Sequence, residues 1–149
     1  MARVDYFDIA NEVKEVLIAD SSLQGVQVTV EDDAPLDSGA WVSVVLVNRN
    51  TPSGQSLANG TRTRFHIKFS LWCWQFSLES TGTASKLRDD LVGKVEIVLM
   101  ANRTLNNKVG NSWLEGGDMM SERIQNDNIS GYIAGGEVVL VVDITASTL

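Results

Sequence analysis

The chain has 149 residues, a mass of 16.3 kDa and 44% apolar residues, which is enough to build the core of one globular domain over residues 1–149. Its net charge of −7 and pI near 4.6 argue against nonspecific binding to nucleic acids or acidic membranes. The single cysteine, Cys73, excludes an internal disulfide, and the single histidine, His66, excludes metal sites that need two histidines. A charged N-terminal segment and the lack of a long apolar stretch predict a soluble cytosolic protein without a signal peptide or membrane span.

The first part of the chain is predicted to hold one helix and three strands. Apolar residues at helical spacing predict an amphipathic helix over about residues 4–19. Alternating valines predict a half-buried strand over 26–30, and an apolar run over Trp41–Val47 predicts a strand buried on both faces. The polar segment 48–60 is long for a hairpin loop, and it leads into a long strand over 61–76.

The second part of the chain is predicted to hold a helix and two strands. An apolar stripe opposite charged residues predicts a helix over about 83–101. The Asn- and Gly-rich segment Leu105–Asp118 is predicted to be irregular, and Met119–Gln125 to form a short strand. A turn over 126–131 precedes a closing strand over Gly135–Ile144, which is rich in β-branched residues. The stripe of the helix consists of Ala84, Leu87, Leu91, Val95, Val98 and Leu99.

The predicted order of elements is α-β-β-β-α-β-β. Strands in runs, separated by helices without regular βαβ alternation, are typical of an α+β fold. The sequence therefore predicts a mainly antiparallel sheet with two helices packed on one face and a long projecting β-hairpin. No internal repeat or second domain is visible.

The strand over 61–76 has two chemically different faces. At about 3.3 Å per residue it could run about 50 Å, longer than a small core requires, so one end of its hairpin is expected to project. One register is apolar and is predicted to face the core: Phe65, Ile67, Phe69, Leu71 and Cys73. The other register begins basic and ends aromatic: Arg62, Arg64, His66, Lys68, Ser70, Trp72 and Trp74.

Charge is distributed unevenly along the chain. Residues 1–37 carry nine acidic and two basic residues, whereas residues 38–78 carry four basic residues and no acidic one. Opposite charges on different surfaces favour head-to-tail contacts between copies, a geometry that can close into a ring. The alternative is that folding brings the acidic and basic residues together within one subunit.

Neither His66 nor Cys73 is predicted to be catalytic. His66 alternates with arginines on a strand and has no neighbouring nucleophile or carboxylate that would form a catalytic pair, so a surface or interface histidine is favoured. Cys73 lies in the apolar register between two tryptophans, where a thiol is usually a small buried side chain. No catalytic or cofactor-binding residue is predicted.

The acidic clusters do not match a known site either. Asp89 and Asp90 are adjacent on a helix and diverge by about 100°, whereas a catalytic dyad needs convergent carboxyl groups. Asp32, Asp33 and Asp37 could form a loose cation site, but they lack calcium-loop spacing and its terminal glutamate. No metal ligand is therefore predicted.

The basic and aromatic residues of the middle segment are the candidate interaction surface. Arginine and tryptophan are enriched at protein interfaces, and cations with aromatics also form platforms for single-stranded nucleic acid. The overall negative charge favours a protein partner, and a solvated sheet face is the alternative for the basic residues. The predicted subunit or partner interface consists of Arg49, Arg62, Arg64, His66, Lys68, Trp72 and Trp74.

The arrangement resembles the tail terminator, or tail completion, proteins of long-tailed bacteriophages. The resemblance covers most of the chain in order, and related neck and connector proteins share parts of it. It rests on the opening helix within Val4–Ala19, the strand Trp41–Val47, the hairpin into Arg64–Trp74, the helix Ala84–Leu91, and the late segment Gly131–Ile133 leading to Glu137–Ile144.

The resemblance implies a non-enzymatic virion protein that assembles in the host cytoplasm. It implies a homo-oligomeric ring, expected to be a hexamer, that caps the tail tube, ends its polymerisation and presents a surface to the head-tail connector protein. It further implies that the strand Arg62–Lys68 and the loop 48–60 face neighbouring subunits or the tube.

Three hypotheses follow, in decreasing order of preference. The first is this structural ring protein of the phage tail or neck. The second is a monomeric module that binds single-stranded nucleic acid through Arg64, Trp72 and Trp74. The third is an enzyme whose site is assembled from residues distant in sequence.

Overall fold

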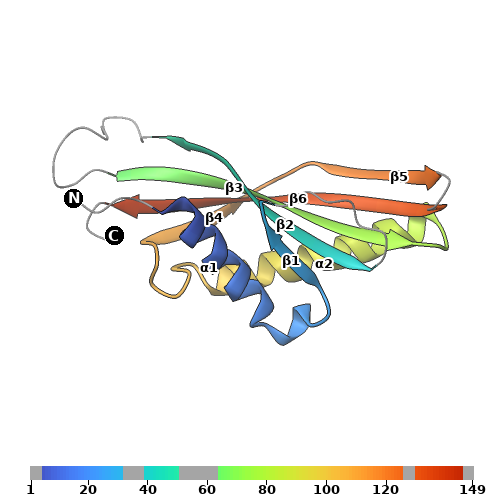
Figure 1. Ribbon diagram of the computed structural model, residues 1–149, viewed down its shortest axis with the longest axis horizontal. Coiled ribbons are helices and arrows are strands. Elements are labelled where there is room, and N and C mark those ends of the chain that lie inside the picture. Colours follow the sequence, from blue (N-terminus) through green and yellow to red (C-terminus); the bar gives the residue numbers. More distant parts are fainter. Residues whose placement is uncertain (1–4, 32–38, 51–63, 126–129, 146–149) are drawn as a thin grey trace.

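The fold is described from a computed structural model for residues 5–31, 39–50, 64–125 and 130–145 (Figure 1). Both helices lie on one side of a twisted sheet, and β3 and β6 run along most of its length. The elements in chain order are α1 (Tyr6–Ile18), a 3₁₀ turn η1 (Ser21–Leu23), β1 (Gln27–Val30), β2 (Ala40–Asn50), β3 (Arg64–Ser77), α2 (Thr81–Ala101), β4 (Asn111–Glu115), β5 (Met119–Gln125) and β6 (Ser130–Thr145).

The described strands form one sheet in the order β1-β2-β3-β6-β4, with β5 also paired to β6. The β1–β2 pair is parallel and every other pair is antiparallel. The predicted α+β class, with a mainly antiparallel sheet and two helices on one face, is confirmed. The long hairpin of β2 and β3 is present, and its connecting residues 51–63 lie outside the described residues.

β4 and β5 are two parts of one interrupted edge strand. Both pair with the side of β6 that β3 leaves open, and the register passes from Glu115 opposite Val139 to Met119 opposite Gly136. Three residues therefore face two, which is a β-bulge. A Cβ at Gly117 would lie only 1.9 Å from the backbone oxygen of Glu137, so this position of the bulge requires glycine.

Each helix begins at a side-chain cap and buries one apolar stripe. Asp5 accepts a hydrogen bond from the backbone N–H of Asp8 (3.0 Å), and Ser80 accepts one from that of Thr83 (3.0 Å). The cap places the start of α2 at Thr81, two residues before the predicted start. The helix side chains buried against the sheet are Ile9, Ala10, Val13, Val16 and Leu17 of α1, and Ala84, Leu91, Val92, Val95, Val98 and Leu99 of α2.

The apolar register of β3 forms the centre of the core, as predicted. Its described members, Ile67, Phe69, Leu71 and Cys73, are all fully buried beneath the helices. Two predicted core positions were wrong. Leu87 is 41% exposed because it lies on the solvent side of α2, and Val47 is 56% exposed because the register shift between Leu46 and Asn48 takes it out of the ladder.

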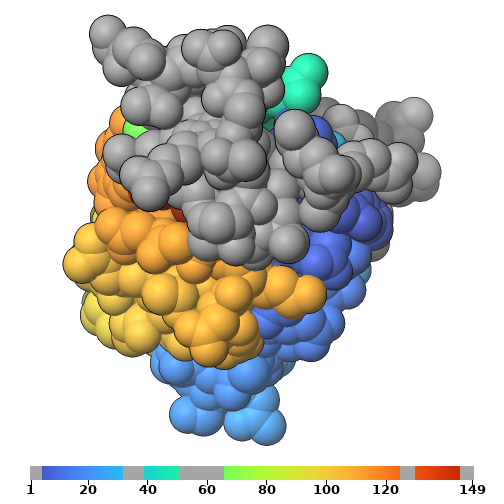
Figure 2. Space-filling model, turned by 90° about the vertical axis from the view of Figure 1, so that its left-hand side faces the viewer, coloured from blue at the N-terminus to red at the C-terminus, as the bar shows by residue number. Residues whose placement is uncertain are grey.

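The prediction of an irregular segment over Leu105–Asp118 was wrong, because it contains β4. This strand has only five residues and is flanked by glycines, and it is held by a partner about 30 residues away in β6. Before it, Leu105 is fully buried, and Asn106 and Asn107 follow with positive φ angles. The connection packs on α1 (Figure 2), where Asn106 donates to Glu12 (2.7 Å) and Lys108 pairs with Asp8 (3.0 Å).

The closing strand is longer than predicted, because β6 begins at Ser130 rather than Gly135. Gly135 and Gly136 lie inside the strand rather than at its start. A Cβ at Gly135 would meet the Trp74 ring at 2.4 Å, and one at Gly136 would meet Val92 at 2.6 Å. These glycines therefore allow close packing on the two faces of the sheet. In a single sequence, glycines of this kind look the same as glycines that mark the boundary of a strand.

We expect the substitution Phe69→Ala to reduce the free energy of unfolding by about 3–5 kcal/mol, because it leaves a cavity at the centre of the core. Denaturant unfolding followed by circular dichroism measures the change. Val47→Ala, on an exposed position of the neighbouring strand, is the control and should change stability by no more than about 0.5 kcal/mol. Equal effects of the two substitutions would contradict this position of the core.

Candidate functional site

The candidate site is the outer face of the sheet, defined as the face opposite α1 and α2 (Figure 1). Residues of β3 that alternate with the buried register point to it, and antiparallel pairing places residues of β6 and β4 beside them. In the β3–β6 pair, His66 lies opposite Asp143, Lys68 opposite Val141 and Trp72 opposite Glu137. The outer face therefore combines residues from three strands that are far apart in the sequence.

The aromatic end of the outer face is tightly organised. The rings of Trp72 and Trp74 stack with centroids 5.2 Å apart and an angle of 18° between their planes, and both remain half-buried. Trp74 lies over Gly135, where no other residue would leave room for its ring. On β2, the buried Trp41 pairs with Trp74 in register and donates its indole N–H to the hydroxyl oxygen of Thr29 (2.8 Å). These contacts fix the rings before any partner binds.

The cationic end of the outer face carries its own carboxylates. The Lys68 ammonium lies 3.3 Å from Glu115 of β4. Nε2 of His66 lies 3.6 Å from Asp143 of β6, an ion pair only when the imidazole is protonated, and the ring meets Trp113 edge-on with centroids 5.1 Å apart. For these two residues, the structure supports the alternative in which folding pairs acid and base within one subunit.

Glu137, opposite Trp72, bonds to the elements on both sides of β6. Its carboxylate accepts hydrogen bonds from the Ser70 hydroxyl (2.5 Å) and from the backbone N–H of Asp118 (3.3 Å). The first bond joins β6 to β3, and the second joins β6 to the bulge between β4 and β5. The carboxylate therefore joins β6 to its neighbours on both sides, next to Trp72.

The structure brings together four of the seven predicted interface residues: His66, Lys68, Trp72 and Trp74. Arg49 is not among them. Its Cα pairs with the inward-facing Ile67, and its guanidinium packs on Tyr6 of α1, with Nη1 donating to the Tyr6 hydroxyl (2.8 Å). The bulge in β2 turns Arg49 to the helix side, so it does not share a face with the other candidates, and its place in an interface stays a prediction. Arg62 and the side chain of Arg64 lie outside the described residues.

Sequence reasoning missed the acidic residues and Trp113 that complete the outer face. β4 was not predicted, so Trp113 and Glu115 had no assigned face. The signal in β6 was present at its two acidic positions, because Glu137 and Asp143 fall in the alternation opposite to the buried positions 138, 140, 142 and 144. The residues found only from the structure are Trp113, Glu115, Glu137 and Asp143.

The other residues considered for chemistry are separate from the outer face. Cys73 is fully buried on the helix side, and burial, with a smaller effect of Glu96, raises the pKa of its thiol to about 12. Asp89 and Asp90 pair with different cations, Arg88 (3.0 Å) and Lys94 (2.9 Å) respectively. Asp32, Asp33 and Asp37 lie outside the described residues, among which no group of three or more His, Cys, Asp or Glu side chains could hold a metal ion.

Comparison of the chain with protein-family models and with curated proteins finds no match. Neither helix in the described part of the chain has the length and apolarity needed to cross a membrane.

We expect Gly135→Ala to destabilise the protein by about 1–3 kcal/mol, because the new methyl group would displace the Trp74 ring. Denaturant unfolding measures the loss, and near-ultraviolet circular dichroism reports the displaced tryptophan. Gly93→Ala is the control, since a Cβ there meets nothing within 4 Å, and it should stabilise α2 by about 0.5–1 kcal/mol. An unchanged tryptophan signal in Gly135→Ala would contradict the contact.

We expect the stability of the protein to fall relative to Cys73→Ala as the pH rises above 9.0, the usual pKa of a cysteine thiol. The unfolded chain loses the thiol proton from that pH upward, whereas the folded chain holds it until about pH 12. The difference should approach about 1.4 kcal/mol per pH unit in this window. Denaturant unfolding of both proteins between pH 8 and 10.5 measures this difference in the free energy of unfolding. Equal pH dependence of the two proteins would contradict the prediction.

Proposed function

We propose that this chain is a structural protein of the tail of a long-tailed bacteriophage, acting as a tail terminator. In this proposal, copies assemble in the host cytoplasm into a ring, expected to be a hexamer, that caps the tail tube and joins the head-tail connector in the virion. The protein acts by binding and not by catalysis. The proposal rests on the resemblance of the sequence and on the chemistry of the outer face.

The observation that carries the proposal is the stacked pair Trp72 and Trp74 on a sheet face that no described helix covers. Large aromatic side chains at the centre of an interface contribute most of its binding energy, and rigid ones lose little entropy when a partner binds. Contacts with each other, with Gly135 and with β2 already fix these rings. We therefore place the surface that meets the tube or a neighbouring subunit at the aromatic end of the outer face.

The charges of the outer face favour a protein partner over single-stranded nucleic acid. A nucleic-acid platform needs cations free to follow the phosphates, together with the aromatic rings. Lys68 is paired with Glu115, His66 faces Asp143, and Glu137 lies beside the tryptophans. These carboxylates would repel a phosphate backbone, and they match a protein surface of mixed charge.

We expect Trp72→Ala to weaken ring formation or binding to the cognate tail-tube protein at least tenfold, because it removes half of the stacked pair. Light scattering on a sizing column, followed by electron microscopy, measures ring formation at low and high salt. Sedimentation with polymerised tube protein measures capping. Phe7→Ala, which removes an aromatic side chain that is 57% exposed on α1, is the matched control and should leave both unchanged.

Three outcomes would overturn this assignment. Equal losses in Trp72→Ala and Phe7→Ala would remove the aromatic end from the interface. Rings that bind the connector protein but not the tube would identify a neck protein instead. A protein that stays monomeric with tube protein present, and retains oligonucleotide at low salt, would be a nucleic-acid-binding module.

A further inference from the structure

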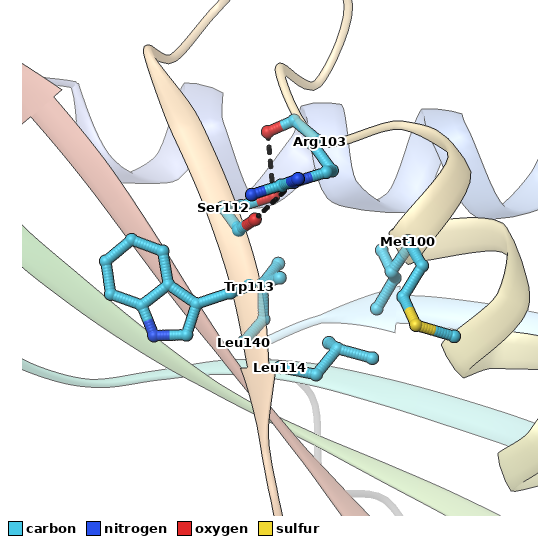
Figure 3. A pocket seen from close by; sticks show the side chains of 7 residues that line it. Met100, Arg103, Ser112, Trp113, Leu114 and Leu140 are labelled. Carbon is cyan, nitrogen blue, oxygen red and sulfur yellow. Dashed lines mark hydrogen bonds between the residues drawn. The ribbon is translucent and has the colours of Figure 1, made fainter.

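An apolar pocket lies between the C-terminal end of α2 and β4, on the helix side of the sheet (Figure 3). Its volume is about 330 Å³. Leu99, Leu114 and Leu140 line it, and Met100 forms one wall. Trp113 points to the opposite side of β4, as the alternation of the strand requires. The pocket is therefore a second candidate surface, distinct from the outer face.

The chemistry of the pocket selects an apolar group next to a carboxylate. Its walls offer almost no polar partner apart from Arg103 and Ser112, which bond to each other across one rim. Nε of Arg103 donates to the Ser112 backbone oxygen (3.3 Å), and the Ser112 hydroxyl donates to the Arg103 backbone oxygen (2.8 Å). The first bond holds the guanidinium through Nε and does not use its two Nη nitrogens, which can donate in parallel to a carboxylate.

Leu78 and Glu79, in the turn between β3 and α2, provide an apolar group next to a carboxylate. Leu78 is 75% exposed, the highest value for any large apolar side chain in the described part of the chain, and the exposed Glu79 follows it. The turn is rigid, because the backbone N–H of Glu79 donates to the Ser77 hydroxyl oxygen (3.1 Å) and Ser80 caps α2. An apolar side chain on a rigid turn beside a carboxylate complements an apolar pocket beside a guanidinium in polarity and charge.

The two features cannot meet within one chain. The turn precedes the first residue of α2, and the pocket begins at Leu99 near its last residue, Ala101. A helix of 21 residues separates them by about 30 Å. A contact between them must therefore join different copies head to tail. An open assembly keeps one free turn at one end and one free pocket at the other until it closes.

We propose that Leu78 of one copy inserts into the α2–β4 pocket of the next, with Glu79 facing Arg103. This inference rests on the proposed function in one respect only: the proposed ring requires a contact between subunits, and Leu78 in the pocket supplies that contact. Ile97 and Met100, exposed beside the pocket at 65% and 57%, extend the apolar surface that the neighbouring turn covers.

Disulfide trapping in the full-length chain tests the contact. Cys73 is buried and its thiol stays protonated, so introduced cysteines are the reactive ones. A Leu78→Cys chain is mixed with a Met100→Cys chain of different mass and oxidised, and the mixed dimer is measured on a non-reducing gel. The control pairs Leu78→Cys with Leu87→Cys, which lies on the solvent side of the same helix.

We expect the Leu78–Met100 pair to give at least tenfold more mixed dimer than the control pair. Glu79→Arg in the Leu78→Cys chain should reduce that yield severalfold, and Arg103→Glu in the Met100→Cys chain should restore it. Circular dichroism confirms that each variant is folded. Equal yields for the two cysteine pairs would overturn the contact, and so would a yield that charge reversal leaves unchanged.

The two proposals fail in different ways. Rings that form without the Leu78–Met100 disulfide would leave the proposed function intact and remove this contact from the ring. Trapped head-to-tail copies that never bind tail-tube protein would retain the contact and remove the proposed function.

Discussion

The structure depends on the pairing of β3 with β6, which runs without interruption from Arg64 opposite Thr145 to Ser77 opposite Tyr132. On the helix side, this ladder supplies the floor of the core on which both helices pack. On its flanks, β3 holds β2, and β6 holds both β4 and β5. Every other described strand except β1 is therefore attached directly to this pair. The pairing also joins residues some 55 to 80 positions apart, so the chain must lose the conformational entropy of a long loop before the two strands can pair.

The same ladder gives the two faces of the sheet different roles. Fully buried apolar side chains on the helix side stabilise the fold, which leaves the outer face free to carry groups that contribute less to stability. There, the stacked tryptophans at one end and the paired charges at the other are held in place by cross-strand neighbours rather than by a helix. Such a face is rigid before binding, which suits a protein that meets its partners as a preformed surface.

A ring protein needs at least two different surfaces, because head-to-tail contacts use unlike patches and a further partner needs a third. In our proposals, the turn at the start of α2 and the pocket at its end form the unlike patches between copies, and the outer face meets the tube or a neighbour. The length of α2 sets the distance between the two ends of this contact. The acidic residues of α1 do not all remain free for assembly, because Asp8 and Glu12 are engaged by the connection after α2.

The sequence by itself determined both helices, the two faces of β3 and the α+β class, because these follow from the local periodicity of apolar residues. Only the tertiary structure decided which strands stand beside β3. It placed Glu115 next to Lys68 and Asp143 next to His66, and the bulge in β2 turned Arg49 to the helix side. It also formed β4 from residues whose sequence is typical of a loop. The physical reason is that helix formation depends on neighbours three or four residues away, whereas strand pairing and pockets depend on contacts between residues far apart in the chain.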